Sequence, residues 1–227
     1  MDYTFFIFPL ISLILIFVAG VIGIRRILKS HYRINTLRTF ANSLNLHYRK
    51  AKVHNFEWEY PGFDFLQKGE ERYAFNIVSG DLNGRKVKGF DYHYQTNQTD
   101  SGSDETTIHF YFSAIIITSS FTMKPLTIRP EALFDKLTAA FGWDDINFES
   151  AEFSRKFHVK AEDRRWAYEV LTPMTIEYLL ESPQYEVQMN NQHLAVRGKS
   201  QFEPSEFEKA FEIGETMLNG IPKFAKS

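Results

Sequence analysis

The chain begins with a long apolar run. The segment from Phe5 to Ile24 contains no charged residue, and at ~1.5 Å per residue its twenty residues form a helix of ~30 Å, the thickness of a bilayer's hydrocarbon core. Pro9 lies in the first turns of this helix, where its missing N–H costs little. The pattern therefore predicts a transmembrane helix.

A cleaved signal peptide is the competing interpretation of this run. It needs a basic segment before the apolar residues and a small-residue cleavage site after them, and neither is present. The positive charges follow the run instead, as Arg25, Arg26 and Lys29. By the positive-inside rule we expect a single-pass protein of the cell (inner) membrane, with its N-terminus outside and its C-terminal domain in the cytoplasm.

Beyond the anchor (residues 1–29), the pattern predicts one soluble domain over residues 30–227. Apolar positions at helical spacing predict an amphipathic helix over residues 31–45 that leads into it. Strand-like runs at 72–79 and 85–95 flank Asn83-Gly84, a dipeptide typical of a type I′ hairpin turn. Polar residues 96–106 predict a loop.

Downstream of this loop, strands and helices alternate without a regular βαβ repeat. We expect strands at 107–119, 126–129 and 153–160, a hairpin of 185–189 with 193–197, and helices at 130–141, 163–171 and 173–181, followed by a last helix opened by a capping box at residues 205–208. Antiparallel hairpins with helices between and after them predict an α+β fold with one antiparallel sheet.

Composition narrows the possible chemistry. The 227 residues include no Cys, which excludes disulfides, thiolate catalysis and Cys-based metal sites. A net charge of −2 gives no electrostatic case for nucleic-acid binding. The sequence contains neither a phosphate-binding glycine loop nor a serine nucleophile elbow, and we expect no cofactor.

Basic residues are concentrated just after the apolar run. Eight cations and no acid lie between Arg25 and Phe56, and the first of them, Arg25, Arg26, Lys29 and Arg33, are the candidate membrane-surface residues. They either bind anionic lipid headgroups or only fix the orientation of the anchor. The last helix has the opposite character, because Glu203, Glu206, Glu208, Glu212 and Glu215 give it an acidic face. That face is either solvated or docks on a basic segment of this or a neighbouring chain.

One group of residues is a candidate for catalysis or metal binding. If residues 96–106 are a hairpin loop, His93 and His109 face each other across adjacent strands beside Asp91. The other interpretation is a set of polar residues on the solvated face of a sheet, and we expect no metal site.

Several short motifs are similar to those of a family of uncharacterised bacterial membrane-anchored proteins, known only as a domain of unknown function. They include Phe90-Asp91-Tyr92-x-Tyr94, Leu126-x-Ile128-Arg129-Pro130-Glu131 and Leu171-Thr172-Pro173-Met174, within residues 70–180. This resemblance implies membrane attachment and architecture, but no activity, cofactor or catalytic residue.

Two functions remain open. The first is a membrane-anchored protein whose cytoplasmic domain is an interaction or scaffold module, with the lipid bilayer and a protein as partners. The second is a membrane-proximal, hydrolase-like enzyme that uses dispersed Asp and His residues such as Asp91, His93 and His109.

Overall fold

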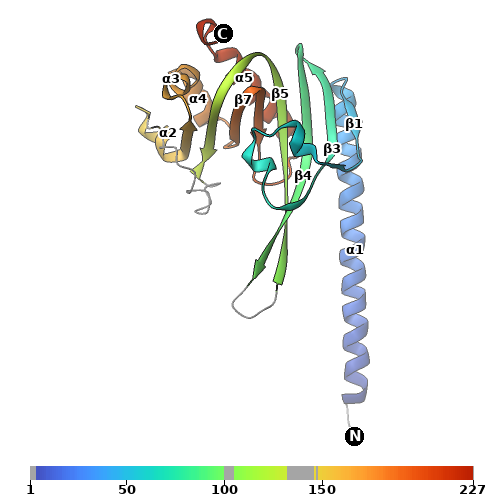
Figure 1. Ribbon diagram of the computed structural model, residues 1–227. Helices are drawn as coiled ribbons and strands as arrows, with labels where there is room; N and C mark the ends of the chain where they lie inside the picture. The colour runs from blue at the N-terminus through green and yellow to red at the C-terminus, as the bar shows by residue number, and fades with distance from the viewer. Residues whose placement is uncertain (1–3, 100–104, 132–145, 147, 227) are drawn as a thin grey trace.

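The computed structural model describes residues 4–99, 105–131, 146 and 148–226, with the side chains of 4–15, 26, 99 and 105 outside that description. A seven-stranded antiparallel sheet is packed with helices, which confirms the α+β fold (Figure 1). The strands are β1 (His47–Arg49), β2 (Val53–His54), β3 (Glu70–Leu82), β4 (Arg85–Thr99), β5 (Glu105–Pro130), β6 (Phe157–Ala161) and β7 (Glu186–Arg197).

Strand β5 organises the sheet. The strand order is β1-β3-β4-β5-β6, while β2 pairs with β3 and β7 pairs with β5. Near Ile115, β5 lies between β4 and β7, and near Ile128 it lies between β7 and β6. Beyond these regions, β4 and β5 continue as a two-stranded ribbon to the pair Thr99–Glu105.

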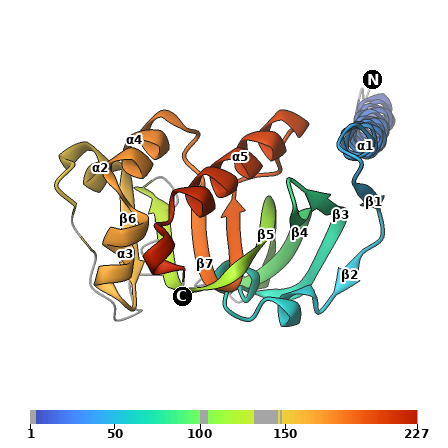
Figure 2. The same cartoon turned by 90° about the horizontal axis from the view of Figure 1, so that it is seen from above.

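The helices cover one face and one end of this sheet. They are α1 (Thr4–Ser43), α2 (Ala151–Lys156), α3 (Arg164–Val170), α4 (Pro173–Glu181) and α5 (Pro204–Gly220), with short 3-10 turns η1 (Phe56–Glu59), η2 (Asp64–Leu66) and η5 (Lys223–Ala225). In Figure 2, α1 and α5 lie on one side of the sheet, the turns η1 and η2 on the other, and α2 to α4 beside β6.

Successive side chains of β4 point to opposite faces of the sheet and contribute to two separate hydrophobic cores. Val87 belongs to the larger core, with Ile115 and Phe207, whereas Phe90 and Tyr92 belong to an aromatic core under η1 and η2. Alternate residues of β4 therefore lie on opposite faces of the sheet. Both faces of the central strands are covered, so the sheet has little solvated surface in the middle.

Local signals fix several element ends, and the predicted turn at Asn83-Gly84 is confirmed. Asn83 and Gly84 have φ of 52° and 77°, as a type I′ turn requires. Thr172 caps α4 by accepting a hydrogen bond from the Thr175 N–H. At the end of α1, Asn45 has φ of 55° and the Leu46 N–H donates to the Ala41 carbonyl, the bond that defines a Schellman motif.

Two predictions for the C-terminal third were wrong in detail, and a third is confirmed. Residues 153–160 are the end of α2 followed by β6, because Ser150 caps a short helix. The predicted hairpin of 185–189 with 193–197 is present within β7, which turns back at Asn191, with φ of 50°, so that Arg197 contacts Glu186 while both arms pair with β5. The capping box of α5 is Glu203 with Glu206, since Pro204 occupies the first helical position.

The N-terminal region and the loops give mixed outcomes. The helix predicted over 31–45 is confirmed as the end of α1, and 107–119 and 126–129 belong to the single strand β5. Pro130, predicted as the first residue of a helix over 130–141, is instead the last residue of β5 and pairs with Phe157, while residues 132–141 lie outside the described residues. Residues 100–104 of the predicted loop also lie outside them, and its flanks are strand. Within the described side chains, no helix is both long and apolar enough to cross a membrane, and residues 5–15 of the predicted span lie outside that description.

We expect Gly69→Ala to destabilise the fold more than Gly84→Ala does. Both glycines have positive φ, which costs a residue with a Cβ ~1–2 kcal/mol. A Cβ at Gly69 would also lie 2.3 Å from the Gln95 carbonyl oxygen, whereas a Cβ at Gly84 meets no atom within 4 Å. Urea unfolding should show a further loss of roughly 1–3 kcal/mol for the Gly69 variant. Equal losses would contradict the close backbone contact.

Candidate functional site

A buried ion pair joins α1 to the sheet. The Arg33 guanidinium of α1 donates through Nε to Asp91 Oδ2 at 2.8 Å and through Nη2 to Asp91 Oδ1 at 2.6 Å. Asp91 is fully buried in β4 and also accepts hydrogen bonds from Asn76 Nδ2 at 2.8 Å and Ser113 Oγ at 2.6 Å. Three side chains therefore satisfy this carboxylate, and one of them comes from α1.

The same network reaches the segment before α5. Arg33 Nη1 donates to the Phe202 carbonyl at 2.8 Å, and the Phe202 N–H donates to Ser113 Oγ at 2.9 Å. Tyr48 Oη donates to Asn76 Oδ1 at 2.7 Å. Burial alone would lower the pKa of Arg33, but the hydrogen bonds and charge of Asp91 outweigh it and raise that pKa, so the pair is ionic. We call Arg33, Asp91, Asn76 and Ser113 the α1 clamp.

The clamp changes the interpretation of two candidate residues. Arg33, expected at the membrane surface, points onto the sheet and is largely buried. The carboxylate of Asp91, a catalytic candidate, is already ion-paired with Arg33. Arg25 and Lys29 are exposed on α1, as a membrane-surface role requires, while the side chain of residue 26 lies outside the described residues.

His93 and His109 do meet. His93 Nε2 lies 3.0 Å from His109 Nδ1, and His93 Nδ1 lies 3.1 Å from the Glu71 carbonyl oxygen. Since a carbonyl only accepts, His93 carries its proton on Nδ1 and accepts from His109 through Nε2. Burial, together with the neighbouring His109 and Lys52, lowers the pKa of His93, so His93 is neutral at pH 7.

Aromatic rings surround this pair. Tyr73 stacks on His93 with a centroid distance of 4.6 Å, and Tyr111 packs against it at 4.7 Å. Among the described residues, no group of three or more His, Asp or Glu side chains is placed to hold a metal ion. The histidine pair thus belongs to an aromatic stack on the ribbon.

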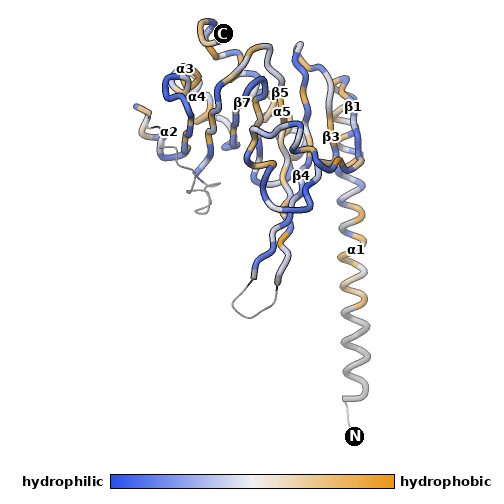
Figure 3. Tube along the Cα trace, viewed as in Figure 1, coloured by the Kyte–Doolittle hydropathy of each residue, from blue (hydrophilic) through white to orange (hydrophobic). Residues whose placement is uncertain are grey.

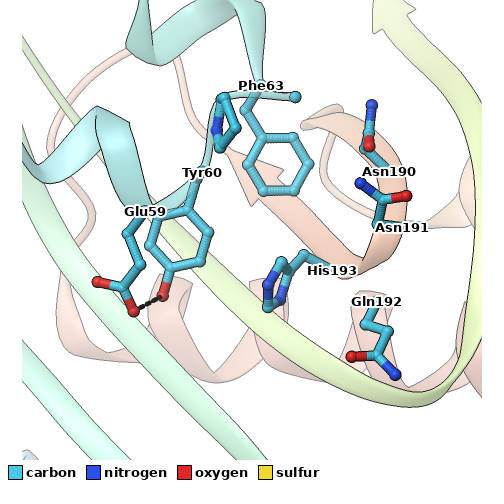
Figure 4. A pocket seen from close by; sticks show the side chains of 9 residues that line it. Glu59, Tyr60, Phe63, Asn190, Asn191, Gln192 and His193 are labelled. Carbon is cyan, nitrogen blue, oxygen red and sulfur yellow. Dashed lines mark hydrogen bonds between the residues drawn. The ribbon is translucent and has the colours of Figure 1, made fainter.

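A small polar pocket lies on the opposite side of the sheet (Figure 4). It has a volume of about 170 Å³ between the chain at Glu59–Phe63 and the bend of β7 at Asn190–His193. The Tyr60 hydroxyl donates to Glu59, and its ring meets His193 edge-on at 5.2 Å. His193 Nδ1 is buried and has no hydrogen-bond partner within the described part of the chain. This volume is below the range of small-molecule sites, roughly 300–1,000 Å³.

A larger, apolar crevice lies between α1, the sheet and α5. Its volume is about 320 Å³, and its walls are mainly hydrophobic. Phe40 and Leu44 come from the end of α1, Val87 and Ile115 from the sheet, and Phe207 and Phe211 from α5. Glu208 and Glu212 also line the crevice. Its size and lining are those of a binding site for an apolar group.

No local pattern in the sequence indicated a second buried charge cluster. Glu186, which is 1 % exposed, accepts hydrogen bonds from Arg129 Nη2, Arg197 Nη1 (both 3.1 Å) and Gln188 Nε2 (2.7 Å). These residues come from β5 and β7, so only the strand pairing brings them together. The crevice was missed for the same reason, because its walls come from α1, α5 and three strands.

Comparison with known proteins identifies the fold but no family. No protein-family model matches the chain, and a search of curated proteins finds no matching relative. Among solved structures, the chain is similar to the mycobacterial trehalose monomycolate transport factor A, TtfA, with a TM-score of 0.62 and 10% sequence identity. The match covers 83% of this chain and 96% of TtfA. The chain therefore has a TtfA-like fold.

Replacing Arg33 by Met should destabilise the protein by roughly 3–5 kcal/mol, because Asp91 would be left buried without its counterion. Arg25→Met is the matched control, since Arg25 is exposed on the same helix, and its effect should be within ~0.5 kcal/mol. Urea unfolding of both variants measures the difference. A small loss in the Arg33 variant would mean that the clamp does not hold α1.

Stability should fall as the solution is acidified below about pH 6.5, the pKa of an unperturbed histidine. The folded-state pKa of His93 is lowered, so the unfolded chain binds more protons in this window. The contribution is complete above about pH 6.5 and is lost as the pH falls toward the folded-state value. Unfolding free energies across this range should show a flatter profile for His93→Gln, with a residual slope from His193, whose pKa is also lowered by burial. Identical slopes in the two proteins would refute the assignment.

Proposed function

We propose that this chain is a membrane-anchored accessory protein of lipid transport, whose cytoplasmic domain binds a partner rather than catalysing a reaction. The observation that carries the proposal is the α1 clamp. It fixes the domain to the same continuous helix that contains the apolar N-terminal run. A domain held in this way presents one constant surface to its neighbours in the membrane.

The described part of α1 supports the anchor. Ile16, Phe17 and Leu28 are 70%, 72% and 62% exposed, so this stretch has apolar side chains that the domain does not cover. In Figure 3, hydrophobic positions predominate in α1 next to its grey segment, and hydrophilic ones appear where the helix approaches the sheet. Together with the uncharged residues from Phe5 onward, this pattern supports insertion in a bilayer.

The orientation of the domain supports a role at the membrane surface. In Figure 1 the β4–β5 ribbon extends toward the same side as the N-terminal part of α1. The outer part of the ribbon has polar side chains, among them Asn97, Gln98, Thr106 and Thr107. Such side chains suit contact with headgroups or with a membrane protein rather than insertion into hydrocarbon. Arg25 and Lys29 then lie at the level of anionic headgroups.

The structural similarity to TtfA supports the proposed role in lipid transport. That protein is a transport factor for trehalose monomycolate, and most of both chains share one fold. We extend the role of transport factor, not the cargo, to this chain. The enzyme alternative has less support, because Asp91 already accepts hydrogen bonds from three side chains and is closed to solvent.

The absence of cysteine allows a direct test of the anchor. Two single variants of the full chain, Asp2→Cys and Glu162→Cys, are produced separately. Intact cells that contain each variant are treated with a membrane-impermeant maleimide. We expect labelling at position 2 only, with position 162 labelled after the membrane is permeabilised, and the chain retained in carbonate-washed membranes. Labelling at position 162 in intact cells, or release of the chain by carbonate, would reject the proposed topology.

A further inference from the structure

We infer that the apolar crevice between α1 and α5 binds a basic amphipathic helix of a partner protein. Helices α1, which ends at Ser43, and α5, which begins at Pro204, form its two sides, and strands β3 to β5 form its floor. An apolar crevice of this kind accepts side chains from the apolar face of a helix that lies over it.

A glycine in the floor of the crevice allows α5 to pack closely on β4. A Cβ at Gly89 would lie 3.1 Å from the Phe207 ring and 3.5 Å from Ile115 Cγ2, so a larger residue there would push α5 away from β4. Phe40 packs against Phe207, with ring centroids 6.1 Å apart, so α1 and α5 meet at these two residues. The other walls, among them Leu44, Leu82 and Phe211, accept apolar side chains from one face of a helix that lies over the crevice.

The charge on the crevice selects a basic partner. Glu208 and Glu212 line it on the α5 side. Glu212 pairs with Lys209 at 2.7 Å, whereas Glu208 has no ion-pair partner within the described part of the chain. Of the other acids of α5, Glu215 pairs with Arg85 and Glu206 belongs to the capping box, so the negative charge of the rim comes from Glu208 and Glu212. Lysine or arginine beside the apolar face of the incoming helix would complement it.

Position along α1 argues against a lipid as the occupant. Phe40 follows Ile24 by sixteen residues, which places the crevice ~24 Å along the helix from the end of the proposed span. An acyl chain would have to leave the bilayer to reach it, and the acidic rim repels anionic headgroups. This argument against a lipid rests on the proposed membrane anchoring of α1. The apolar lining and the acidic rim of the crevice do not depend on that anchoring.

The test uses the full chain in phosphatidylcholine nanodiscs and two labelled helical peptides. Both peptides have leucine at positions i, i+3, i+4 and i+7; one has lysine at the flanking positions and the other glutamate. By fluorescence anisotropy, after subtraction of empty nanodiscs, we expect the lysine peptide to bind and the glutamate peptide not to bind. Glu208→Lys with Glu212→Lys should weaken binding about tenfold, because two exposed attractions become repulsions. Leu82→Trp, which fills the crevice from its β3 wall, should abolish it.

Glu162→Lys with Glu181→Lys is the control, since it changes net charge equally at exposed sites away from the crevice and should leave binding unchanged. Unfolding of each variant is measured alongside. The inference is overturned if the lysine peptide does not bind, if the control weakens binding as much as the rim variant, or if Leu82→Trp has no effect. It is also overturned if oleate alone occupies the crevice. None of these outcomes bears on the topology test, so the two proposals fail separately.

Discussion

The bidentate ion pair between Arg33 and Asp91 is the interaction on which the rest of the structure depends. Asp91 is fully buried, and a buried carboxylate is stable only with a counterion and hydrogen bonds. Its counterion comes from α1, so the sheet reaches its folded state only when α1 is docked. Helix α1 is therefore part of the domain rather than a tether to it.

This constraint explains the position of the other features. With α1 fixed by Arg33 and by the buried side chains of Ile34, Leu37 and Ala41, its last turn lies opposite α5 and leaves the apolar crevice between them. The same docking directs the β4–β5 ribbon toward the N-terminal side of α1 (Figure 1). One ion pair thus sets both the surface available to a partner and the surface that faces the bilayer in the proposed arrangement.

Local signals in the sequence predicted much of this fold. The Asn83-Gly84 turn and the helix at 173–181 each depend on residues close in sequence, and each was confirmed. The errors occurred where distant pairing decides the outcome. Residues 107–119 and 126–129 were predicted as separate strands, but they belong to the single strand β5, both parts of which pair with β7.

The candidate site also contains some contacts that local sequence patterns predict and others that they do not. His93 and His109 were predicted to meet because a hairpin register brings them together, and they do. That Arg33 rather than the histidines would engage Asp91 could not be read from the sequence, because the two residues are 58 positions apart and belong to a helix and a strand whose docking has no local signature. The ion pairs of Glu186 and the apolar crevice could not be predicted for the same reason.

The central claim, that α1 and the domain form one rigid unit, is tested most directly by pulsed electron paramagnetic resonance on the full chain in nanodiscs. Spin labels at Lys29→Cys and Thr106→Cys report the separation between α1 and the ribbon, and the native chain has no cysteine to interfere. The account predicts one narrow distance distribution that broadens when Arg33 is replaced by Met. A broad distribution in the otherwise native chain, or a narrow one unchanged by loss of Arg33, would contradict it.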